Sequence, residues 1–478
     1  MTPAFRSRPG QLHGVGLAAV MTCAAVGLGA LVAFDERIAV GALGATALVA
    51  CCFLKPFVGL LCWLPGVFLP ASIAGGALWR AGFVLCVAAW VCDAIQRRSI
   101  TDERIREFRW LVALIIAMGL WFGATVLWAT DPTAAVREFQ YWPVALMVFG
   151  LLLTRITSTR RLLLLVAAFV ASATLAAATG LFALRSTASA SADPLTSLDN
   201  RVSGAAGDPN GLGAGLIAAA ILAIGLACAV RLAWVRVTIA AAIMTLAAAA
   251  AGTASRMVAI SVGVAFVAAL AIFRKQIGWV LAASVCVALP AAVWFACYPP
   301  AWKRMVVSSD GGSGREDLWW AAFHLTLKSP IAGLGLANFQ VHKPAIALDI
   351  GAVKNATVVA ERPYVVHNTY LQLSAESGVI GLALFLVIVG FCVWCSLRAG
   401  RDFASGGRRG LAALSRTVAV SVFSMLASCA FISIPRDHRL WILLALGPVL
   451  LSLARAETQR PSGHRAEVSP VTESCLAS

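Results

Sequence analysis

The sequence predicts an all-α polytopic membrane protein with about 12–14 transmembrane helices and a large, partly helical loop on the outer face. Three observations support this fold class. Hydrophobic residues make up 60% of the 478 residues and charged residues only 13%, whereas a soluble domain has about 45–50% and about 25%. Apolar stretches of about 20 residues, the length of a membrane-spanning helix, recur along the chain. Lys and Arg gather on alternate connections between these stretches.

The apolar stretches give the candidate helices in order. They are 11–34, 38–54, 57–74, 77–95, 110–130, 139–154, 161–184, 210–230, 233–252, 257–273, 277–298, 376–397, 411–434 and 440–454. Lys55 and Pro56 interrupt the stretch 38–74, which also contains Pro65 and Pro70, so it is alternatively one hairpin lying partly in the interface. The count is then twelve instead of fourteen, and in both cases it is even.

Positive charge predicts the orientation. If the N-terminus lies inside, 23 of the 38 Lys and Arg residues fall on the same side. Seven of the remaining 15 lie in the long loop 299–375, which the positive-inside rule does not count. The comparison is therefore 23 against 8, and both termini are expected in the cytoplasm. The first apolar run lacks a small-residue cleavage site, so we expect a membrane anchor and not a removable signal.

This topology divides the chain into four parts. Residues 1–298 hold the N-terminal transmembrane helices and a short external loop, 185–209; residues 299–375 form the large external loop; residues 376–454 hold the C-terminal helices; residues 455–478 are a cytoplasmic tail that we expect to be disordered. Long ordered loops are usually functional, and 299–375 contains half of the six His. The chemistry is therefore expected on the outer face.

Charge and cysteine content exclude other classes of protein. The net charge is +16, but 60 charged residues in 478 are too sparse for a nucleic-acid-binding surface, so no nucleic-acid partner is expected. Twelve of the 13 Cys lie in or beside apolar runs, which indicates neither a disulfide framework nor a zinc site. Cys392 and Cys395 form a C-x-x-C pair inside an apolar run, where a packing role is favoured over a redox role.

The long loop contains a helix signal that includes an arginine. Ser313 and Glu316 form a capping box ahead of Leu318, Trp319, Ala322, Phe323 and Leu327, which predicts an amphipathic helix that Pro330 ends. Arg315 then lies in the first turn, where the helix dipole favours an anion, and its guanidinium group suits bidentate contact with a phosphate. The alternative is a solvated Arg beside Glu316 and Asp317.

His367 begins a second predicted helix of the loop. Apolar residues at helical spacing follow it, with Gly378 as the expected C-cap, so this helix should descend to the membrane surface. The pKa of a His suits proton abstraction near neutral pH, although a capping or packing role is the alternative. Between the two helices, Gly333–Phe339 forms a double-Gly turn. No strand precedes it, so it is a weak match to a dinucleotide-binding loop.

Two connections at the outer ends of spans carry further polar residues. Gly252–Arg256 joins two apolar runs and places Arg256 where the positive-inside bias discourages an Arg; a helix C-cap or a lipid headgroup contact is the alternative. Asp208–Gly211 opens another span, with Asn210 at the helix start and Arg201 just upstream. The alternative there is an ordinary helix start.

These motifs are more specific together than singly. They are Pro-Asn at 209–210, Ser-Arg at 255–256, Ser-Gly-Arg-Glu-Asp-Leu-Trp at 313–319, Gly-Leu-Gly-Leu-Ala-Asn-Phe at 333–339 and His-Asn-Thr-Tyr-Leu-Gln-Leu-Ser-Ala-Glu-Ser-Gly-Val-Ile-Gly-Leu at 367–382. In this order, within a chain of many spans, they closely resemble the O-antigen ligase and polysaccharide polymerase superfamily. The resemblance covers roughly residues 200–395, and elsewhere it extends only to hydropathy.

The resemblance implies a membrane glycosyltransferase on the periplasmic face of the bacterial inner membrane. The donor would be an undecaprenyl-diphosphate-linked glycan, and the acceptor a glycan or the lipid A core, with membrane lipid around both. By motif, His367, Arg256 and Arg315 are the expected catalytic residues. Further residues expected to bind substrate are Arg201, Asn210, Arg304, Arg362 and Asn368.

The physical chemistry of such a reaction fits these residues. Fixed guanidinium groups stabilise the charge that develops on a diphosphate leaving group, and His367 would take the proton of the acceptor hydroxyl. Direct displacement would invert the anomeric configuration. The acidic residues of the long loop are scattered, so neither a metal ion nor another cofactor is expected.

Other functions remain as alternatives. A polysaccharide polymerase would share the fold and the residues above, and the ligase type is favoured slightly because the motifs resemble the ligase-related domain as a whole. A lipid-linked glycan transporter or flippase generally places ionisable groups within its spans, whereas here they lie mostly at span ends. A non-catalytic scaffold would need neither the exposed His nor the outer Arg residues.

Overall fold

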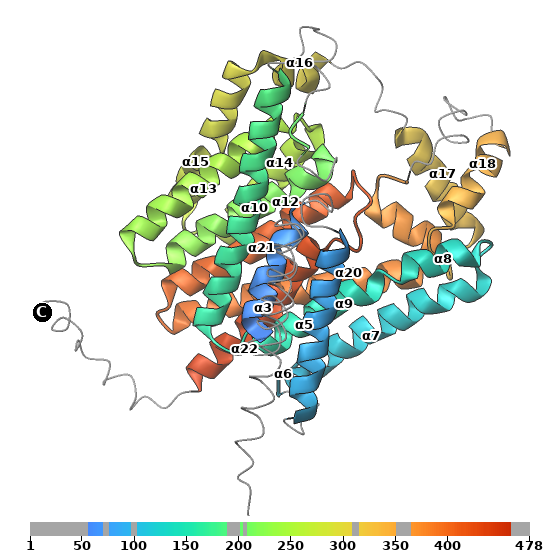
Figure 1. Cartoon of the computed structure of the whole chain (residues 1–478), viewed down its shortest axis with the longest axis horizontal. Coiled ribbons are helices and arrows are strands. Elements are labelled where there is room, and N and C mark those ends of the chain that lie inside the picture. Colours follow the sequence, from blue (N-terminus) through green and yellow to red (C-terminus); the bar gives the residue numbers. More distant parts are fainter. Residues whose placement is uncertain are drawn as a thin grey trace, which may run out of the picture.

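The computed structural model describes residues 56–69, 76–96, 103–188, 201–203, 208–307, 315–349 and 365–459, and all regular structure within these ranges is helical (Figure 1). In chain order the elements are α3 (Pro56–Trp63), η1 (Leu64–Val67), α5 (Gly76–Gln96), α6 (Glu103–Glu107), α7 (Arg109–Ala124), η2 (Thr125–Trp128), α8 (Pro132–Phe139), α9 (Trp142–Arg155), α10 (Thr159–Ala188), α12 (Pro209–Ala229), α13 (Ala233–Gly252), α14 (Arg256–Ile272), α15 (Ile277–Cys297), α16 (Pro299–Val307), α17 (Arg315–Lys328), α18 (Phe339–Asp349), α20 (Thr369–Ser405), α21 (Arg409–Cys429) and α22 (His438–Thr458).

The predicted all-α polytopic membrane fold is confirmed. Within the described residues, eight helical segments are long and apolar enough to cross a membrane: Arg109–Trp128, Thr159–Leu184, α12, α13, α15, α20, α21 and α22. The predicted stretches 11–34 and 38–54 lie outside the described residues. Three apolar segments are shorter, namely Phe57–Val67, Gly82–Cys92 and α14, and α9 has only 14 residues. Gly82–Cys92 belongs to the 21-residue α5, and the count of eight covers the described residues alone, so the predicted number of 12–14 stays a prediction.

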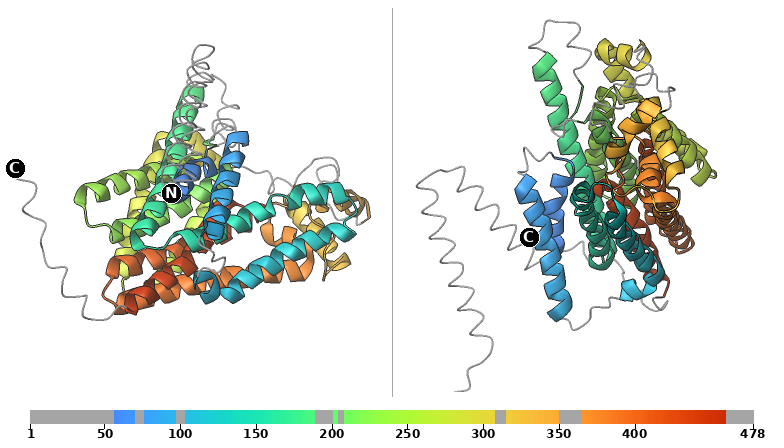
Figure 2. Two further views of the ribbon diagram at one scale, coloured as in Figure 1. Left: turned by 60° about the horizontal axis from the view of Figure 1, so that its bottom comes forward. Right: turned by 90° about the vertical axis from the view of Figure 1, so that its right-hand side faces the viewer.

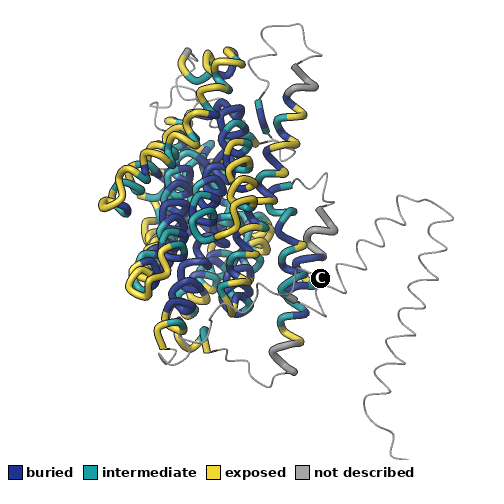
Figure 3. The backbone as a smooth tube through the Cα atoms, turned by 90° about the vertical axis from the view of Figure 1, so that its left-hand side faces the viewer, coloured by how far each residue is buried: buried dark blue, intermediate teal, exposed yellow. Residues whose placement is uncertain are grey.

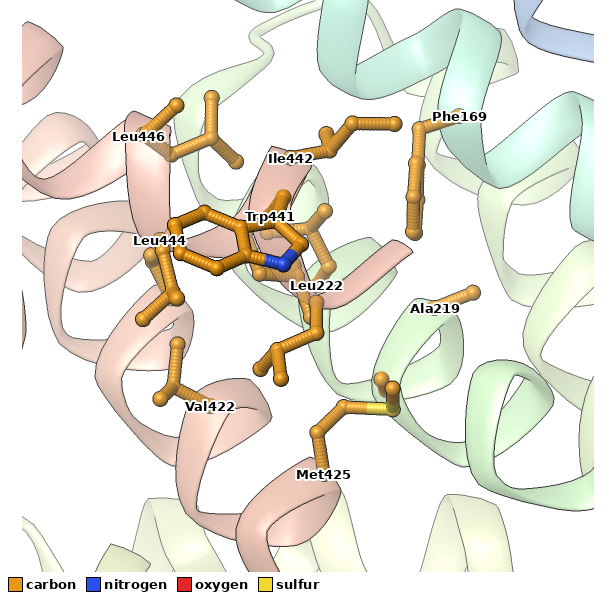
Figure 4. Packing of buried hydrophobic residues seen from close by; sticks show 14 of the residues in the cluster. Phe169, Ala219, Leu222, Val422, Met425, Trp441, Ile442, Leu444 and Leu446 are labelled. Carbon is orange, nitrogen blue, oxygen red and sulfur yellow. The ribbon is translucent and has the colours of Figure 1, made fainter. Parts of the chain in front are cut away.

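The centre of the bundle is α22, which packs against α20, α21 and α9. Its residues from Leu440 to Ala454 are all buried (Figure 3). Figure 4 shows the indole of Trp441 among aliphatic side chains that include Leu222 of α12 and Met425 of α21. The indole nitrogen of Trp441 donates to the carbonyl oxygen of Pro435 over 3.1 Å, so this large side chain is buried with its polar atom satisfied.

Small residues allow these helices to approach closely. A methyl group added at Gly447 of α22 would overlap the carbonyl of Cys392 in α20, and one added at Gly225 of α12 would overlap the Thr417 side chain in α21. Helices in membranes associate largely through such close packing, because lipid tails are as apolar as the side chains. Cys392 and Cys395 are both buried free thiols, consistent with the packing role predicted for them.

α17 confirms the helix predicted in the long loop, although Ser313, the expected N-cap, lies outside the described residues. Leu318, Ala322 and Leu325 are buried against Phe339 of α18 and Ala375 of α20. Phe323 and Leu327, which the predicted apolar face included, are more than half exposed, so the buried stripe is narrower than the sequence indicates.

The double-Gly turn joins this outer layer to the bundle. Leu334 and Gly335 donate their backbone N–H groups to the carbonyl oxygens of Ala375 and Glu376 in α20, over 3.0 and 2.9 Å. Gly378 has a positive φ of 67°, and a methyl group there would overlap the carbonyl of Ile331. The helix that begins at Thr369 ends at Gly378, as the sequence predicts, and a second helical part of α20 continues from there to Ser405. The break lets the turn dock on the backbone of α20.

The same turn is also bound to the connection between α7 and α8. α7 packs against α20, and the two helices can be followed in Figures 1 and 2. The Asn338 side-chain oxygen accepts from the backbone N–H of Asp131 over 2.7 Å, and its amide donates to the Asp131 carbonyl over 3.2 Å. Asn338 is fully buried, so these bonds satisfy its polar atoms. The outer helices α17 and α18 are thereby fixed relative to the bundle.

Candidate functional site

The first turn of α12 is the point where the candidate site residues meet. Asp208 caps this helix, since its carboxylate accepts from the backbone N–H groups of Asn210 and Gly211, each over 3.0 Å. The Asn210 side-chain oxygen accepts from Arg201 over 3.2 Å and from Ser255 over 2.7 Å. The helix start predicted at Asp208–Asn210 is therefore correct, and two loops far apart in the sequence are held together on it.

The connection between α13 and α14 confirms the predicted corner at Thr253–Arg256. Ala254 has a positive φ of 45°, and Arg256 is the first residue of α14. The exposed Arg256 donates through Nε to the Met305 carbonyl of α16 over 3.1 Å. Arg304, the preceding residue of α16, lies on the same short helix. Arg256 and Arg304 thus belong to one corner, beside Ser255 and the start of α12.

Arg315 and His367 both interact with the N-terminal end of α12. Arg315 is the first residue of α17, as its predicted place in the first turn requires, and His367 immediately precedes the N-cap of α20. Each of these half-buried groups interacts electrostatically with Asp208, and His367 also interacts with Arg315. One carboxylate, one guanidinium group and one imidazole are therefore gathered at this end of the bundle.

The backbone holds His367 in an unusual conformation. Its φ is 56°, a left-handed value that costs a non-glycine residue about 1–2 kcal/mol. The next residues fix this conformation. Asn368 caps α20 by accepting from the N–H groups of Tyr370 and Leu371, each over 3.0 Å. The Thr369 hydroxyl donates to the Ile432 carbonyl over 2.7 Å, so the start of α20 is bound to the segment between α21 and α22.

The environment of His367 favours its neutral form. Burial lowers the pKa of His367 below its ordinary value, the positive charge of Arg315 lowers it further, and the negative charge of Asp208 opposes both. Burial also lowers the pKa of Arg315, while Asp208 raises it. A His whose pKa lies below about 6.5 is largely unprotonated at neutral pH. The imidazole is therefore able to accept a proton beside the guanidinium group of Arg315.

The comparison with known families matches this part of the chain. Residues 239–386 match the model of the O-antigen ligase family. This segment is similar to the O-antigen ligase family. It contains Arg256, Arg315, His367 and the double-Gly turn, and it supports a membrane function of the O-antigen ligase or polymerase type, with lipid-linked glycans and polysaccharide acceptors as the general substrates. No curated protein sequence matches the chain.

The structure places the predicted residues of the O-antigen ligase site in two neighbouring groups. Around Ser255 lie Arg201, Asn210 and Arg256, with Arg304 on the adjoining helix. Around Asp208 lie Arg315 and His367, with Asn368 as the helix cap. Arg362, also predicted to bind substrate, lies outside the described residues. In the described part of the chain, no three His, Cys, Asp or Glu side chains come together in a way that could hold a metal ion.

The other two histidines of the long loop have different surroundings. The ring of His324 lies 3.6 Å, centroid to centroid, from that of Trp320, and its Nδ1 is 3.0 Å from the Trp320 carbonyl oxygen. The Nε2 atom of His342 lies 2.9 Å from the Thr130 hydroxyl oxygen. Neither of these contacts involves Asp208 or Arg315.

Asp437 and Arg439 form an ion pair that the sequence motifs did not predict. The Arg439 guanidinium donates through Nε to both carboxylate oxygens of Asp437, over 2.9 and 3.0 Å. Burial raises the pKa of Asp437, but the charge and hydrogen bonds of Arg439 outweigh it and hold the pKa below its ordinary value. Arg439 also lies against Gly211 and Gly215, where an added methyl group at Gly215 would be 2.7 Å from its Nη1.

A signal for this pair exists in the sequence. Arg436, Asp437, His438 and Arg439 are four consecutive ionisable residues at the outer end of a span, where the positive-inside rule discourages Arg. Their meeting with the glycines of α12 depends on packing between helices more than 200 residues apart, which no local pattern indicates. The pair supports the first turn of α12, and with it Asp208 and Asn210.

Proposed function

We propose that the chain transfers a glycan from an undecaprenyl-diphosphate carrier to a hydroxyl group of an acceptor, as an inverting O-antigen ligase. The observation that carries this proposal is the position of His367. It is a half-buried imidazole with a lowered pKa, in a constrained left-handed conformation, beside Arg315 and Asp208. Backbone strain and a perturbed pKa at the same residue are typical of functional sites.

The arginines would hold the diphosphate of the donor. Arg315 lies in the first turn of α17, and Arg256 in the first turn of α14, where helix dipoles also favour anions. Arg201, which is bound through Asn210 to the same corner, adds a further positive charge. As the bond between the anomeric carbon and the phosphate oxygen lengthens, negative charge grows on the diphosphate. Preorganised guanidinium groups stabilise that charge, so we propose a reaction that needs no metal ion.

His367 would act as the general base. The acceptor oxygen forms a bond to the anomeric carbon from the side opposite the diphosphate, and its proton passes to the neutral imidazole of His367 as the carbon–oxygen bond to the diphosphate breaks. The products are an inverted glycosidic bond and the free carrier diphosphate. Asp208 stabilises the imidazolium that forms, because its negative charge favours the protonated ring.

The proposal also covers the location of the protein in the cell and the kind of acceptor. We infer a bacterial inner-membrane protein with the site on the periplasmic face and both termini in the cytoplasm, from the 23 against 8 distribution of Lys and Arg. The family match supports the ligase or polymerase type in general, and we propose the ligase type because the motifs resemble the ligase-related domain as a whole. The acceptor is then the lipid A core or another glycan that receives a finished chain.

A strain that lacks the protein tests ligase against polymerase. If the protein is a ligase, lipid-linked polymer accumulates and is absent from its final acceptor. If single lipid-linked repeats accumulate and long chains are missing, the protein is a polymerase. An unchanged glycan profile and unchanged carrier pools would contradict both. Complementation with wild type and with a His367→Asn variant shows whether the defect depends on the candidate base.

A further inference from the structure

A cluster of three side chains lies where the segment between α21 and α22 meets the connection between α8 and α9. Arg436 pairs with Glu138, with 3.1 Å between Nε and Oε1, and its guanidinium carbon lies 4.4 Å from the centroid of the Tyr141 ring. Tyr141 is 38% exposed, and the side chains of Arg436 and Glu138 are 37% and 20% exposed. These three residues, the Arg436 cluster, are therefore reachable from solvent. All three lie outside the segment 239–386 that matches the O-antigen ligase family.

The Arg436 cluster is bound to the start of α20, where the candidate base lies. Thr369, two residues after His367, donates through its hydroxyl to the Ile432 carbonyl over 2.7 Å. The same hydroxyl accepts from the Ile434 N–H over 3.0 Å, and Arg436 follows two residues later. Only two short stretches of backbone therefore separate the cluster from His367, and both lie at the same end of the bundle.

α20 adds a buried amide beside the Arg436 cluster. Gln372 lies one turn after the N-cap of α20 and donates through Nε2 to the Glu376 carboxylate over 3.3 Å. Glu376 in turn interacts electrostatically with Glu138 of the cluster. The side-chain oxygen of Gln372 is buried, and no described residue donates a hydrogen bond to it. Buried acceptors without a donor are rare in folded proteins, so this oxygen indicates a bound molecule that carries a hydrogen-bond donor.

The chemistry of this region favours a neutral ligand that is rich in hydroxyl groups. The charges of Arg436 and Glu138 cancel, so the pair offers no net charge to a phosphate. Carboxylate and amide oxygens accept from hydroxyl groups, a guanidinium group donates to them, and an aromatic ring packs against C–H groups. Burial raises the pKa of Glu138 while Arg436 lowers it, which shows that the pair is partly removed from water. A sugar ring, with hydroxyl groups around a C–H face, fits this set.

We propose that the Arg436 cluster and Gln372 bind a sugar ring of the acceptor, beside the ring whose hydroxyl group reacts. The inference deepens the proposed function and rests on it. Arg256 and Arg315, which would hold the donor diphosphate, begin α14 and α17, whereas the cluster belongs to the segments just before α9 and α22. Donor and acceptor would thus be bound by different parts of the bundle, as attack from the side opposite the diphosphate requires.

The first experiment measures glycan transfer to lipid A core in detergent and determines KM separately for this acceptor and for the undecaprenyl-diphosphate-linked donor. Arg436→Gln should raise the KM for the acceptor by at least about tenfold, because hydrogen bonds from a charged donor are lost. The kcat and the KM for the donor should stay close to those of wild type. An unchanged KM for the acceptor would overturn the proposal, and so would a rise in the KM for the donor that equals or exceeds the rise for the acceptor.

Two sets of variants control for effects on folding. Arg455 pairs with Glu107 over 2.8 Å at the other end of α22, with side chains exposed to a similar degree, so Arg455→Gln should change neither KM. At Tyr141, the Tyr141→Phe variant keeps the aromatic ring and should keep the KM for the acceptor, whereas Tyr141→Ala should raise it. Equal KM values in the two Tyr141 variants would contradict the binding of a sugar ring at this position, whatever the yield of Arg436→Gln.

The second experiment separates a failure of the acceptor subsite from a failure of the proposed function. Binding of a deacylated and dephosphorylated core oligosaccharide to His367→Asn protein, measured by isothermal titration calorimetry, does not require transfer. Addition of Arg436→Gln should weaken this binding by at least about tenfold, and that result would support the subsite even if no transfer were detected. Binding that Arg436→Gln leaves unchanged, or that inorganic pyrophosphate displaces, would contradict it.

Discussion

Two motifs of the O-antigen ligase domain, the His367 segment and the double-Gly turn at Gly333–Phe339, differ in what they do for the protein. His367 lies in a charged environment with Arg315 and Asp208. The double-Gly turn makes backbone bonds to α20 and, through Asn338, to the start of α8. The His367 segment therefore carries the proposed chemistry, and the double-Gly turn fixes the helix on which that chemistry depends.

The sharpest test of this division is His367→Asn. Asn tolerates the left-handed conformation that position 367 requires, so the protein level and the thermal midpoint should be unchanged. Loss of the general base should lower glycan transfer by at least about 10²-fold. His324→Asn is the control, because His324 contacts Trp320 and not the charged group at Asp208. Similar losses of activity in the two variants would show that position 367 supports the loop and not the reaction.

Gly378→Ala disturbs the docking on α20 of the double-Gly turn and the residues before it, and it should act on stability. The φ of 67° and ψ of −174° at this position lie in a region essentially restricted to glycine, which costs another residue about 1–3 kcal/mol, and the added methyl group would overlap the Ile331 carbonyl. The yield of folded protein and its thermal midpoint in detergent should fall, whereas activity per folded molecule should stay close to that of wild type. Gly390→Ala, where the added methyl group meets no atom within 4 Å, should not lower the midpoint. A normal midpoint with lost activity in Gly378→Ala would place the double-Gly turn in the chemistry.

The smallest expected effect is a shift in pH dependence in Asp208→Asn. The charge of Asp208 raises the pKa of His367, so its removal should lower that pKa further. A general base works only when it is unprotonated, and activity is lost as the pH falls through its pKa. The acid limb of kcat/KM against pH should therefore move to lower pH. Asn is also a good N-cap, so α12 should remain intact.

Asp131→Asn is the matched control for this pH experiment. Asp131 caps α8 in the same way, by accepting from the Ala134 N–H over 3.0 Å, but it belongs to the corner bound by Asn338. Its substitution should leave the pH profile in place. An acid limb that moves to higher pH in Asp208→Asn, or that moves equally in both variants, would contradict the assignment of His367 as the titrating base.

The sequence indicates the parts of this site that depend on local signals. Helix starts at Asp208, Arg256, Arg315 and Thr369 follow from capping residues and apolar periodicity, which act within a few residues. The partners of the double-Gly turn and the position of Arg439 do not follow from such signals. Both depend on glycines that let backbones far apart in the sequence approach, and a glycine in a sequence does not show which neighbour it accommodates. Asn210 shows the same limit, since its side-chain oxygen joins Arg201 and Ser255 through bonds that the motif alone does not reveal.

The central position of α22 has a consequence for biosynthesis. Every other described helix precedes α22 in the chain, yet its buried face completes the core, and its first residues, Asp437 and Arg439, support the first turn of α12. A nascent chain that has inserted all the earlier helices therefore still has an open centre and an unsupported α12. The corner at the start of α12 is completed only when α22 leaves the ribosome and enters the bundle, so an incomplete polypeptide lacks a finished candidate site.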